Sequence, residues 1–423
     1  MSANGYSNGV SGDLRYVPLS YNNAESRTSA LRLVLTIFPD WEHSEGDVEF
    51  VCFTDGITNT LLKAVKRRPG YTDEQIDKEA VLLRAYGKGT EVLIDREREA
   101  TSHSLLSQHN LAPPLLARFH NGLMYRFIQG HVCSPEDLAK ESVWRGVARR
   151  LGQWHAVLPT VSRGPTTAVQ NGHTGTSLLD SRLESAPPLE TLNAITPGKP
   201  TPNIWTVMQK WILALPVDTD AERQRQPRLQ KELKQTVKEL GDRHGLGKDG
   251  LVFGHCDLLS GNLIIRSEKG SKPPTNHVET VKFIDYEYAT PSPAAFDIAN
   301  HFAEWGGFDC NYHVLPTRSQ RRRFVREYLA SYYSHLLLKS VPVADSEVDR
   351  LFDEVDLFRG IPGFYWGIWA LIQATISQID FDYAAYAEIR LGEYWAWRDE
   401  VEGTRARAGK EMGLRERRWA QEE

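Results

Sequence analysis

The sequence predicts an α+β protein with two lobes, a small one built mainly of antiparallel strands and a larger, mainly helical one. Short β-rich runs dominate up to about residue 130, and helical patterns dominate from Pro135 onward. The chain has 423 residues, which is long for a single hydrophobic core. Its 41% hydrophobic and 25% charged residues are typical of a globular protein.

The small lobe is expected to follow an N-terminal extension, residues 1–45, which carries one helix at 29–38 with Ser29 as its cap. The lobe itself covers residues 46–130, and Asp55-Gly56 marks a hairpin turn within it. The expected elements are strands at 48–53, 59–66 and 79–86, a helix at 95–108, and strands at 116–119 and 124–128.

The larger lobe is predicted over residues 131–400 and is mostly helical. Its apolar residues recur with helical spacing after Pro135, and residues 160–202 form a polar loop. Segment 361–379 is mostly apolar, but Gln373 interrupts it, so we expect a buried helix and no membrane span. Residues 401–423 form a charged tail, and both this tail and the cluster 318–326 are predicted to be solvated helix faces.

Composition excludes several classes of protein. A net charge of −5 gives no basic footprint for nucleic acid. The four cysteines are scattered without paired spacing, which favours reduced thiols in a cytoplasmic protein over disulfides or a zinc site. The N-terminus shows no signal-peptide pattern.

One motif in the sequence predicts a catalytic function. His-x-Asp-x-x-x-x-Asn runs from His255 to Asn262, and a second carboxylate, Asp285, closes a short apolar strand. Phosphoryl transfer from ATP needs a carboxylate to orient the attacking hydroxyl and an Asn with a second carboxylate to hold Mg²⁺. We therefore predict Asp257 as the catalytic base and Asn262 and Asp285 as Mg²⁺ ligands. The alternative is two ordinary strands with polar turns.

Two longer stretches of sequence are more specific than this kinase motif alone. Residues 283–304 and 364–373 resemble the choline/ethanolamine kinase family, a branch of the protein-kinase-like phosphotransferases. Matching stretches run from about Phe53 to Trp395, and Leu258-Leu259 resembles the ethanolamine-preferring members. The resemblance implies a two-lobed protein-kinase-like fold and transfer of the ATP γ-phosphate to the hydroxyl of ethanolamine, the first step of CDP-ethanolamine phospholipid synthesis. It also implies that Asp297 hydrogen-bonds the catalytic-loop backbone, and it admits a homodimer.

The nucleotide site follows by the same resemblance. Arg84 closes an apolar strand and takes the role of the phosphate-binding cation, paired with Glu99 or, one register away, Glu97. Asp55 stands where the family usually has Gly, and it supports the rival hypothesis of a catalytically silent binding module. The remaining predicted contacts are the phosphate loop and the adenine hinge: Gly56, Thr58, Asn59, Phe127 and Ile128.

The amine end of the substrate needs aromatic faces and a carboxylate. Trp366 and Trp369 are three residues apart on a predicted helix, so they share a face. By resemblance Tyr288, Tyr386 and Glu304 complete the pocket. On sequence alone, aromatic residues at helical spacing belong to a hydrophobic core more often than to a binding site. The primary ammonium of ethanolamine has three N–H donors that need acceptors, whereas the quaternary ammonium of choline has none. Glu304 could serve either amine, so choline kinase is the alternative function. Another small-alcohol phosphotransferase would leave the two tryptophans unused.

Overall fold

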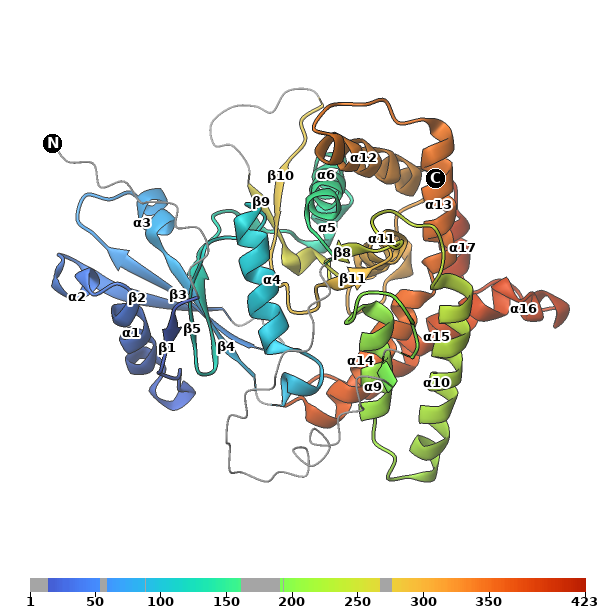
Figure 1. Ribbon diagram of the computed structural model, residues 1–423, viewed down its shortest axis with the longest axis horizontal. Coiled ribbons are helices and arrows are strands. Elements are labelled where there is room, and N and C mark those ends of the chain that lie inside the picture. Colours follow the sequence, from blue (N-terminus) through green and yellow to red (C-terminus); the bar gives the residue numbers. More distant parts are fainter. Residues whose placement is uncertain (1–13, 54–58, 88, 161–190, 193, 267–275) are drawn as a thin grey trace. The chain divides into compact units, whose positions relative to one another are not determined.

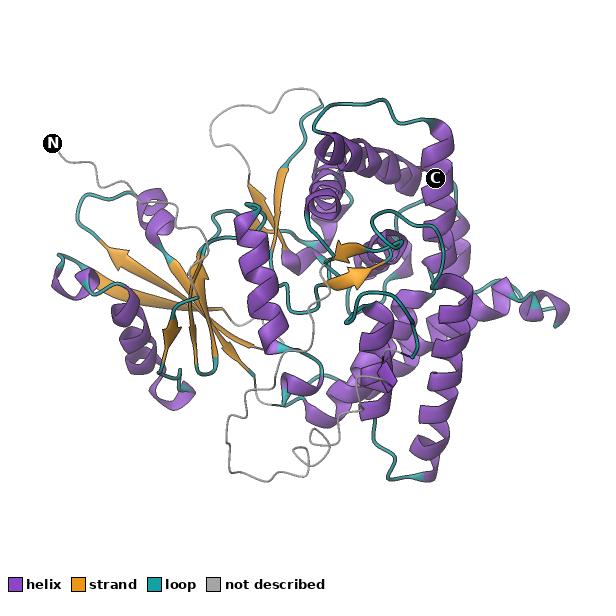
Figure 2. Cartoon of the chain, in the orientation of Figure 1, coloured by secondary structure: helices purple, strands orange, loops and turns teal. Residues whose placement is uncertain are grey.

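The computed structural model describes residues 14–53, 59–87, 89–160, 191–192, 194–266 and 276–423. The predicted turn at Asp55-Gly56 and most of the predicted loop 160–202 lie outside these residues. Contacts divide the chain into two compact units, Met1–Lys88 with Ala112–Gln129, and Gly89–Leu111 with Gly130–Glu423. Strands dominate the first unit and helices the second (Figures 1 and 2).

The first unit is built on a six-stranded sheet with strand order β1-β5-β6-β4-β3-β2, antiparallel except for the β1–β5 pair. Helix α1 covers its core, because Leu33 and Val34 are buried against Leu83 and Phe119 of the sheet. The elements are β1 (Tyr16–Val17), α1 (Ser26–Ile37), α2 (Asp40–His43), β2 (Asp47–Phe53), β3 (Asn59–Arg67), α3 (Asp73–Glu79), β4 (Val81–Tyr86), β5 (Leu115–Phe119) and β6 (Gly122–Arg126).

Two predictions in this unit were wrong. Ser29 does not cap α1: it lies inside the helix, and its hydroxyl donates to the carbonyl of Glu25. The strand expected from residue 79 begins at Val81, because a capping box between Thr72 and Gln75 starts helix α3 in the segment before it.

The second unit is mainly helical. Its helices are α4 (Arg96–Gln108), α5 (Pro135–Leu138), α6 (Glu141–Val157), α9 (Ile204–Ala214), α10 (Asp220–Leu240), α11 (Ala294–Ala303), α12 (Arg318–Leu337), α13 (Asp345–Phe358), α14 (Ile361–Ile376), α15 (Tyr383–Val401), α16 (Thr404–Arg407) and α17 (Leu414–Ala420). Its strands are β7 (His131–Val132), β8 (Val252–Gly254), β9 (Leu263–Arg266), β10 (Thr280–Phe283) and β11 (Thr290–Ser292). By its contacts, α4 belongs to this unit.

Helices α14 and α15 form the part of the core that positions the site. The predicted buried helix is confirmed, since almost every α14 side chain is buried. A Cβ on Gly363 would meet the Arg390 carbonyl at 2.5 Å, and one on Gly367 would meet Leu391 Cγ at 2.7 Å. Glycine at both positions therefore lets α15 lie directly against α14. Among the described helices, none has the length and apolar content to cross a bilayer.

The prediction that segments 318–326 and 401–423 are solvated was wrong in part. Arg321 is fully buried, and α17 buries Arg415, Glu416 and Trp419. These charges are tolerated because each meets an opposite charge or a carbonyl brought from a distant part of the chain.

Candidate active site

The loop from β8 to β9 brings two of the predicted catalytic residues together. The amide nitrogen Nδ2 of Asn262 donates to the carbonyl of Asp257 at 2.8 Å and to its Oδ2 at 3.0 Å. Asp257 is 7% exposed and Asn262 9%. The loop is thus closed on itself by a side chain at each end.

Asp285 reaches the same place from the next strand. Strands β9 and β10 pair antiparallel, and past their end the Ile284 N–H donates to the Asn262 carbonyl at 3.0 Å. His255 Nε2 donates to the Ile284 carbonyl at 3.0 Å and so supports the loop. Asp285 itself has a left-handed backbone, φ 62°. The structure therefore brings Asp257, Asn262 and Asp285 to one site.

Helix α11 supports the loop. Asp297 accepts the backbone N–H groups of His255 and Cys256, each at 2.8 Å, so the predicted role of Asp297 is confirmed. Asn300 and His301, which sequence reasoning missed, bond the carbonyls of Cys256 and Leu258 at 3.1 and 2.8 Å. Their spacing from Asp297, three and four residues along a helix, was the available signal.

The pKa values of Asp257 and Asp297, two of the buried carboxylates of this region, are shifted in opposite directions. Burial raises the pKa of Asp257 well above its usual value, and the charges of Asp285, Glu304 and Glu287 add to the effect. Burial also acts to raise the pKa of Asp297, but hydrogen bonding and charge from His155 outweigh it and hold that pKa below its usual value. Asp257 is therefore a carboxylate whose charge becomes favourable when a cation binds nearby.

An aromatic cluster stands beside the loop. Trp366 and Trp369 of α14 meet edge to face with ring centroids 5.5 Å apart, and Tyr288 lies 5.8 Å from Trp366. The Trp369 indole N–H donates to the Tyr288 hydroxyl at 2.8 Å. The Trp366 indole donates to Asn300 Oδ1 at 2.8 Å, and Asn300 also holds the loop. One residue therefore joins the cluster to the catalytic loop.

Glu304 and Tyr386, the other predicted amine-pocket residues, are linked by a residue that the sequence analysis missed. Arg390 donates to Glu304 at 3.0 Å and lies 5.8 Å from the ring centroid of Tyr386. Burial raises the pKa of Glu304, while the charge of Arg390 opposes the rise. Rings continue from Trp369 to Tyr386 through two further aromatics at centroid distances of 4.8 to 5.7 Å, namely Tyr383 and Phe381.

The predicted nucleotide contacts lie in the first unit or outside the described residues. Gly56 and Thr58 lie outside. Asn59 is the first residue of β3, opposite Tyr86. Arg84 is buried in β4, opposite Leu61 and Leu123 of the flanking strands.

The predicted hinge follows β6. The Phe127 N–H donates to the Ala80 carbonyl at 3.0 Å, and Lys63 Nζ lies 3.9 Å from the Phe127 ring centroid. Ile128 is half-buried beside it. Their contact with adenine stays a prediction.

Of the two glutamates proposed to pair with Arg84, Glu99 is buried and Glu97 exposed. Glu99 accepts from Arg96 at 3.0 Å, and Arg96 also pairs with Glu287 at 3.3 Å. Arg84 belongs to the other unit, so its pairing with either glutamate stays a prediction.

The predicted metal ligands have suitable chemistry. Asn262 and Asp285 offer oxygen donors, which Mg²⁺ prefers, and Mg²⁺ sites commonly use one or two protein groups with phosphates and water. Within the described residues, no group of three or more His, Cys, Asp or Glu is arranged to hold a metal ion alone. The oxygen donors of Asn262 and Asp285 are of the kind that Mg²⁺ prefers.

Comparison with known proteins identifies the family of the chain. The family model for choline/ethanolamine kinase matches residues 50–395. The chain is 32% identical to ethanolamine kinase 1 of Mus musculus, with 89% of this chain and 90% of that protein covered. It is 30% identical to a probable ethanolamine kinase of Arabidopsis thaliana, with 86% and 83% covered.

Solved structures support the fold. A Plasmodium vivax ethanolamine kinase superposes with a TM-score of 0.64 at 24% identity, covering 88% of this chain and 89% of that one. A choline kinase of Cryptosporidium parvum gives 0.55 at 20% identity, covering 88% and 97%. The protein-kinase-like fold predicted from the sequence is confirmed, and the chain belongs to the choline/ethanolamine kinase family.

Proposed function

We propose that this protein is an ATP-dependent ethanolamine kinase. It transfers the γ-phosphate of ATP to the hydroxyl of ethanolamine, which gives phosphoethanolamine for CDP-ethanolamine phospholipid synthesis. The observation that carries the proposal is the bridge by Asn300, which ties the loop of Asp257 to the indole of Trp366. A group suited to activate a hydroxyl and a surface suited to hold a cation are thus fixed to each other.

Each group has one role in this proposal. Asp257 orients the substrate hydroxyl and accepts its proton as the phosphorus–oxygen bond forms. Asn262 and Asp285 would hold Mg²⁺, which supplies positive charge against the phosphates. Arg84 and the amides of the loop containing Gly56, Thr58 and Asn59 contact the phosphates, and the backbone at Phe127 and Ile128 receives adenine. Transfer is direct, because no nucleophilic side chain is required.

The ammonium end is held by the second set of groups. Trp366, Trp369, Tyr288 and Tyr386 offer aromatic faces, and Glu304 supplies the negative charge. Ethanolamine carries three N–H donors, and the cluster contains acceptors for them at Glu304 and at the Tyr288 hydroxyl. Glu304 already accepts from Arg390 and Tyr288 from Trp369, but each keeps a further lone pair that an ethanolamine N–H can use and choline, which has no N–H, cannot, so we favour ethanolamine.

Turnover with Mg²⁺ and ATP, measured with ethanolamine and choline separately and in competition, tests the choice. Ethanolamine should be consumed first from an equimolar mixture. Preference for choline would move the function to the alternative within the family. ATP binding without turnover of either amine would favour the silent binding module.

We place the enzyme in the cytoplasm. Its four cysteines are unpaired thiols, and two of them, Cys133 and Cys256, are buried. Thiols persist in this form in a reducing compartment. Fractionation with detection of the full chain would contradict this placement if the protein were recovered with secreted material.

A further inference from the structure

A line of buried ion pairs leads away from the proposed amine pocket. Arg390 Nη2 lies 3.0 Å from Glu304 Oε1, and Arg390 Nε lies 3.5 Å from Glu393 Oε2. Arg415 Nε is 3.7 Å from that same Glu393 oxygen, and its Nη1 is 3.1 Å from Glu416 Oε1. We call these five residues, Glu304, Arg390, Glu393, Arg415 and Glu416, the charge chain.

The charge chain is almost completely buried. Its side chains are 1–7% exposed, so each charge depends on its neighbours for compensation. Arg390 stands between two carboxylates, Glu304 and Glu393, and Glu393 stands between two arginines, Arg390 and Arg415. A change in charge at Arg415 must therefore alter how Arg390 divides its attraction between Glu304 and Glu393.

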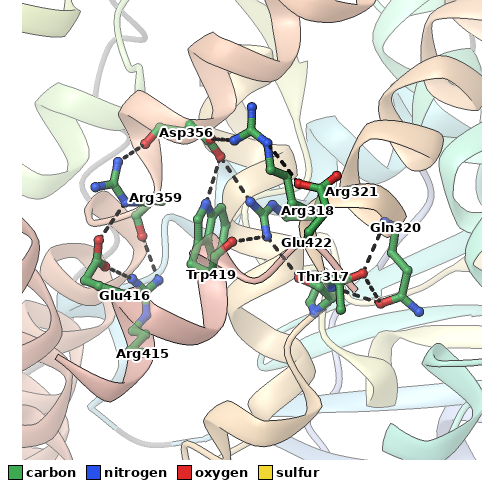
Figure 3. A network of polar contacts seen from close by, with 11 residues as sticks. Thr317, Arg318, Gln320, Arg321, Asp356, Arg359, Arg415, Glu416, Trp419 and Glu422 are labelled. Atoms are coloured by element: carbon green, nitrogen blue, oxygen red, sulfur yellow. Dashed lines mark hydrogen bonds and ion pairs between the residues drawn. The ribbon is translucent and has the colours of Figure 1, made fainter. Parts of the chain in front are cut away.

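The far end of the charge chain is fixed by the C-terminal helix. Arg359 Nε donates to Glu416 Oε2 at 2.7 Å, and the Arg415 guanidinium donates to the Arg359 carbonyl at 2.7 Å. Figure 3 shows both contacts. The Trp419 indole donates to Asp356 at 2.7 Å in the same network. Helix α17 is thus anchored on α13, and Arg415 has a defined position.

We propose that Arg415 is a positioning residue for amine binding. By compensating Glu393, it leaves Arg390 directed at Glu304 and so keeps the pocket carboxylate ionised and in place. The C-terminal helix is in this way part of the amine site. The inference rests on the proposed function, because it takes Glu304 as the counterion of the ammonium.

Neutral and conservative variants test this role. Arg415→Gln should raise the amine Kd and KM about 3- to 30-fold and leave the ATP KM unchanged. Arg415→Lys, which keeps the charge, should stay closer to wild type. The matched control is Arg417→Gln on the same helix, whose side chain is 53% exposed, and it should behave as wild type.

A double variant separates positioning from folding. In Glu393→Gln/Arg415→Gln the competing carboxylate is gone, so the attraction of Arg390 is directed at Glu304, and amine affinity should return toward wild type. The inference is overturned if the double variant binds the amine no better than Arg415→Gln, or if Arg415→Gln changes only the melting temperature. Should Arg415→Gln not fold, the double variant must still bind the amine like wild type.

The readout also separates this inference from the proposed function. Calorimetric titration of ethanolamine and choline into the wild-type protein measures amine binding without turnover. If wild type binds neither amine, the proposed function falls and the inference with it. If wild type and Arg415→Gln bind the amine equally well, only the inference fails.

Discussion

Asn262 donates its amide nitrogen to both the carbonyl and the carboxylate of Asp257, at 2.8 and 3.0 Å. The nitrogen is therefore committed to Asp257, which leaves the amide oxygen as the atom suited to a metal ion. The proposed base and a proposed metal ligand are thereby held in one loop. Neither can be displaced without moving the other.

Replacing Asp257 with Asn should lower kcat by about 10²–10⁴-fold, because the lost interaction belongs to the transition state. ATP binding should persist. The same change should raise the melting temperature, because it removes a buried carboxylate whose pKa is raised by burial. Turnover, calorimetric ATP binding and thermal unfolding check the three effects. Full activity in the variant would refute the assignment of the base.

The pH profile of kcat/KM should have an acid limb whose apparent pKa lies above the ordinary range of carboxylates. The catalytic base must be ionised, and burial with the neighbouring charges of Asp285 and Glu304 raises the pKa of Asp257. Activity should therefore rise as pH rises through that pKa. Steady-state rates across pH measure the limb in the free enzyme. A limb near the model-peptide value of about 3.9 would contradict this electrostatic picture.

The tryptophan cluster should determine amine affinity. Trp369→Leu removes an aromatic face worth about 2 kcal/mol toward a desolvated cation, so the amine KM should rise about 30-fold while the ATP KM holds. Trp205→Leu is the matched control, because Trp205 is equally buried but contacts Phe358 outside the cluster. Equal KM changes in both variants would show that Trp369 is only core.

Asp297→Asn should weaken the hydrogen bonds that hold the catalytic loop and change how the melting temperature depends on pH. The pKa of Asp297 is held low in the fold, mainly by His155 against the effect of burial, so its contribution to stability is present above the unfolded-state pKa and is lost as pH falls through the folded one. The gap in melting temperature between wild type and variant should therefore narrow on acidification. Thermal unfolding at several pH values tests this, and a gap that widens toward acid would contradict it.

Arg321→Gln should destabilise the protein by about 3 kcal/mol, because Arg321 is fully buried and supports α17. Its guanidinium donates to the Pro316 carbonyl at 3.0 Å. It also donates to the Trp419 carbonyl at 2.9 Å (Figure 3). Arg323→Gln on the same helix, with a side chain 53% exposed, should change stability by no more than about 0.5 kcal/mol. Denaturant unfolding compares the two, and equal losses would contradict the network.

The parts of the site that depend on local pattern were predictable from the sequence. Asp257, Asn262 and Asp285 follow from a spacing that one turn and one strand pair can satisfy, and the structure brings them together. The shared face of Trp366 and Trp369 follows from helical period and is also observed.

The parts that depend on distant contacts were not predictable. The Arg390–Glu304 pair joins residues 86 positions apart, and Arg321 meets a carbonyl 98 positions away, so local charge pattern could only suggest solvation. Cys256 lies at φ 63°, a left-handed backbone that Asn adopts more readily and that a cysteine does not signal.

The most direct measurement of the central claim is detection of the product. Wild-type protein and Asp257→Asn would each be incubated with Mg²⁺, ATP and ethanolamine, and ³¹P NMR would follow the phosphate. We predict that wild type converts the γ-phosphate into phosphoethanolamine in step with ADP formation and that the variant does not. ADP formed without phosphoethanolamine, or equal product from both proteins, would contradict direct transfer assisted by Asp257.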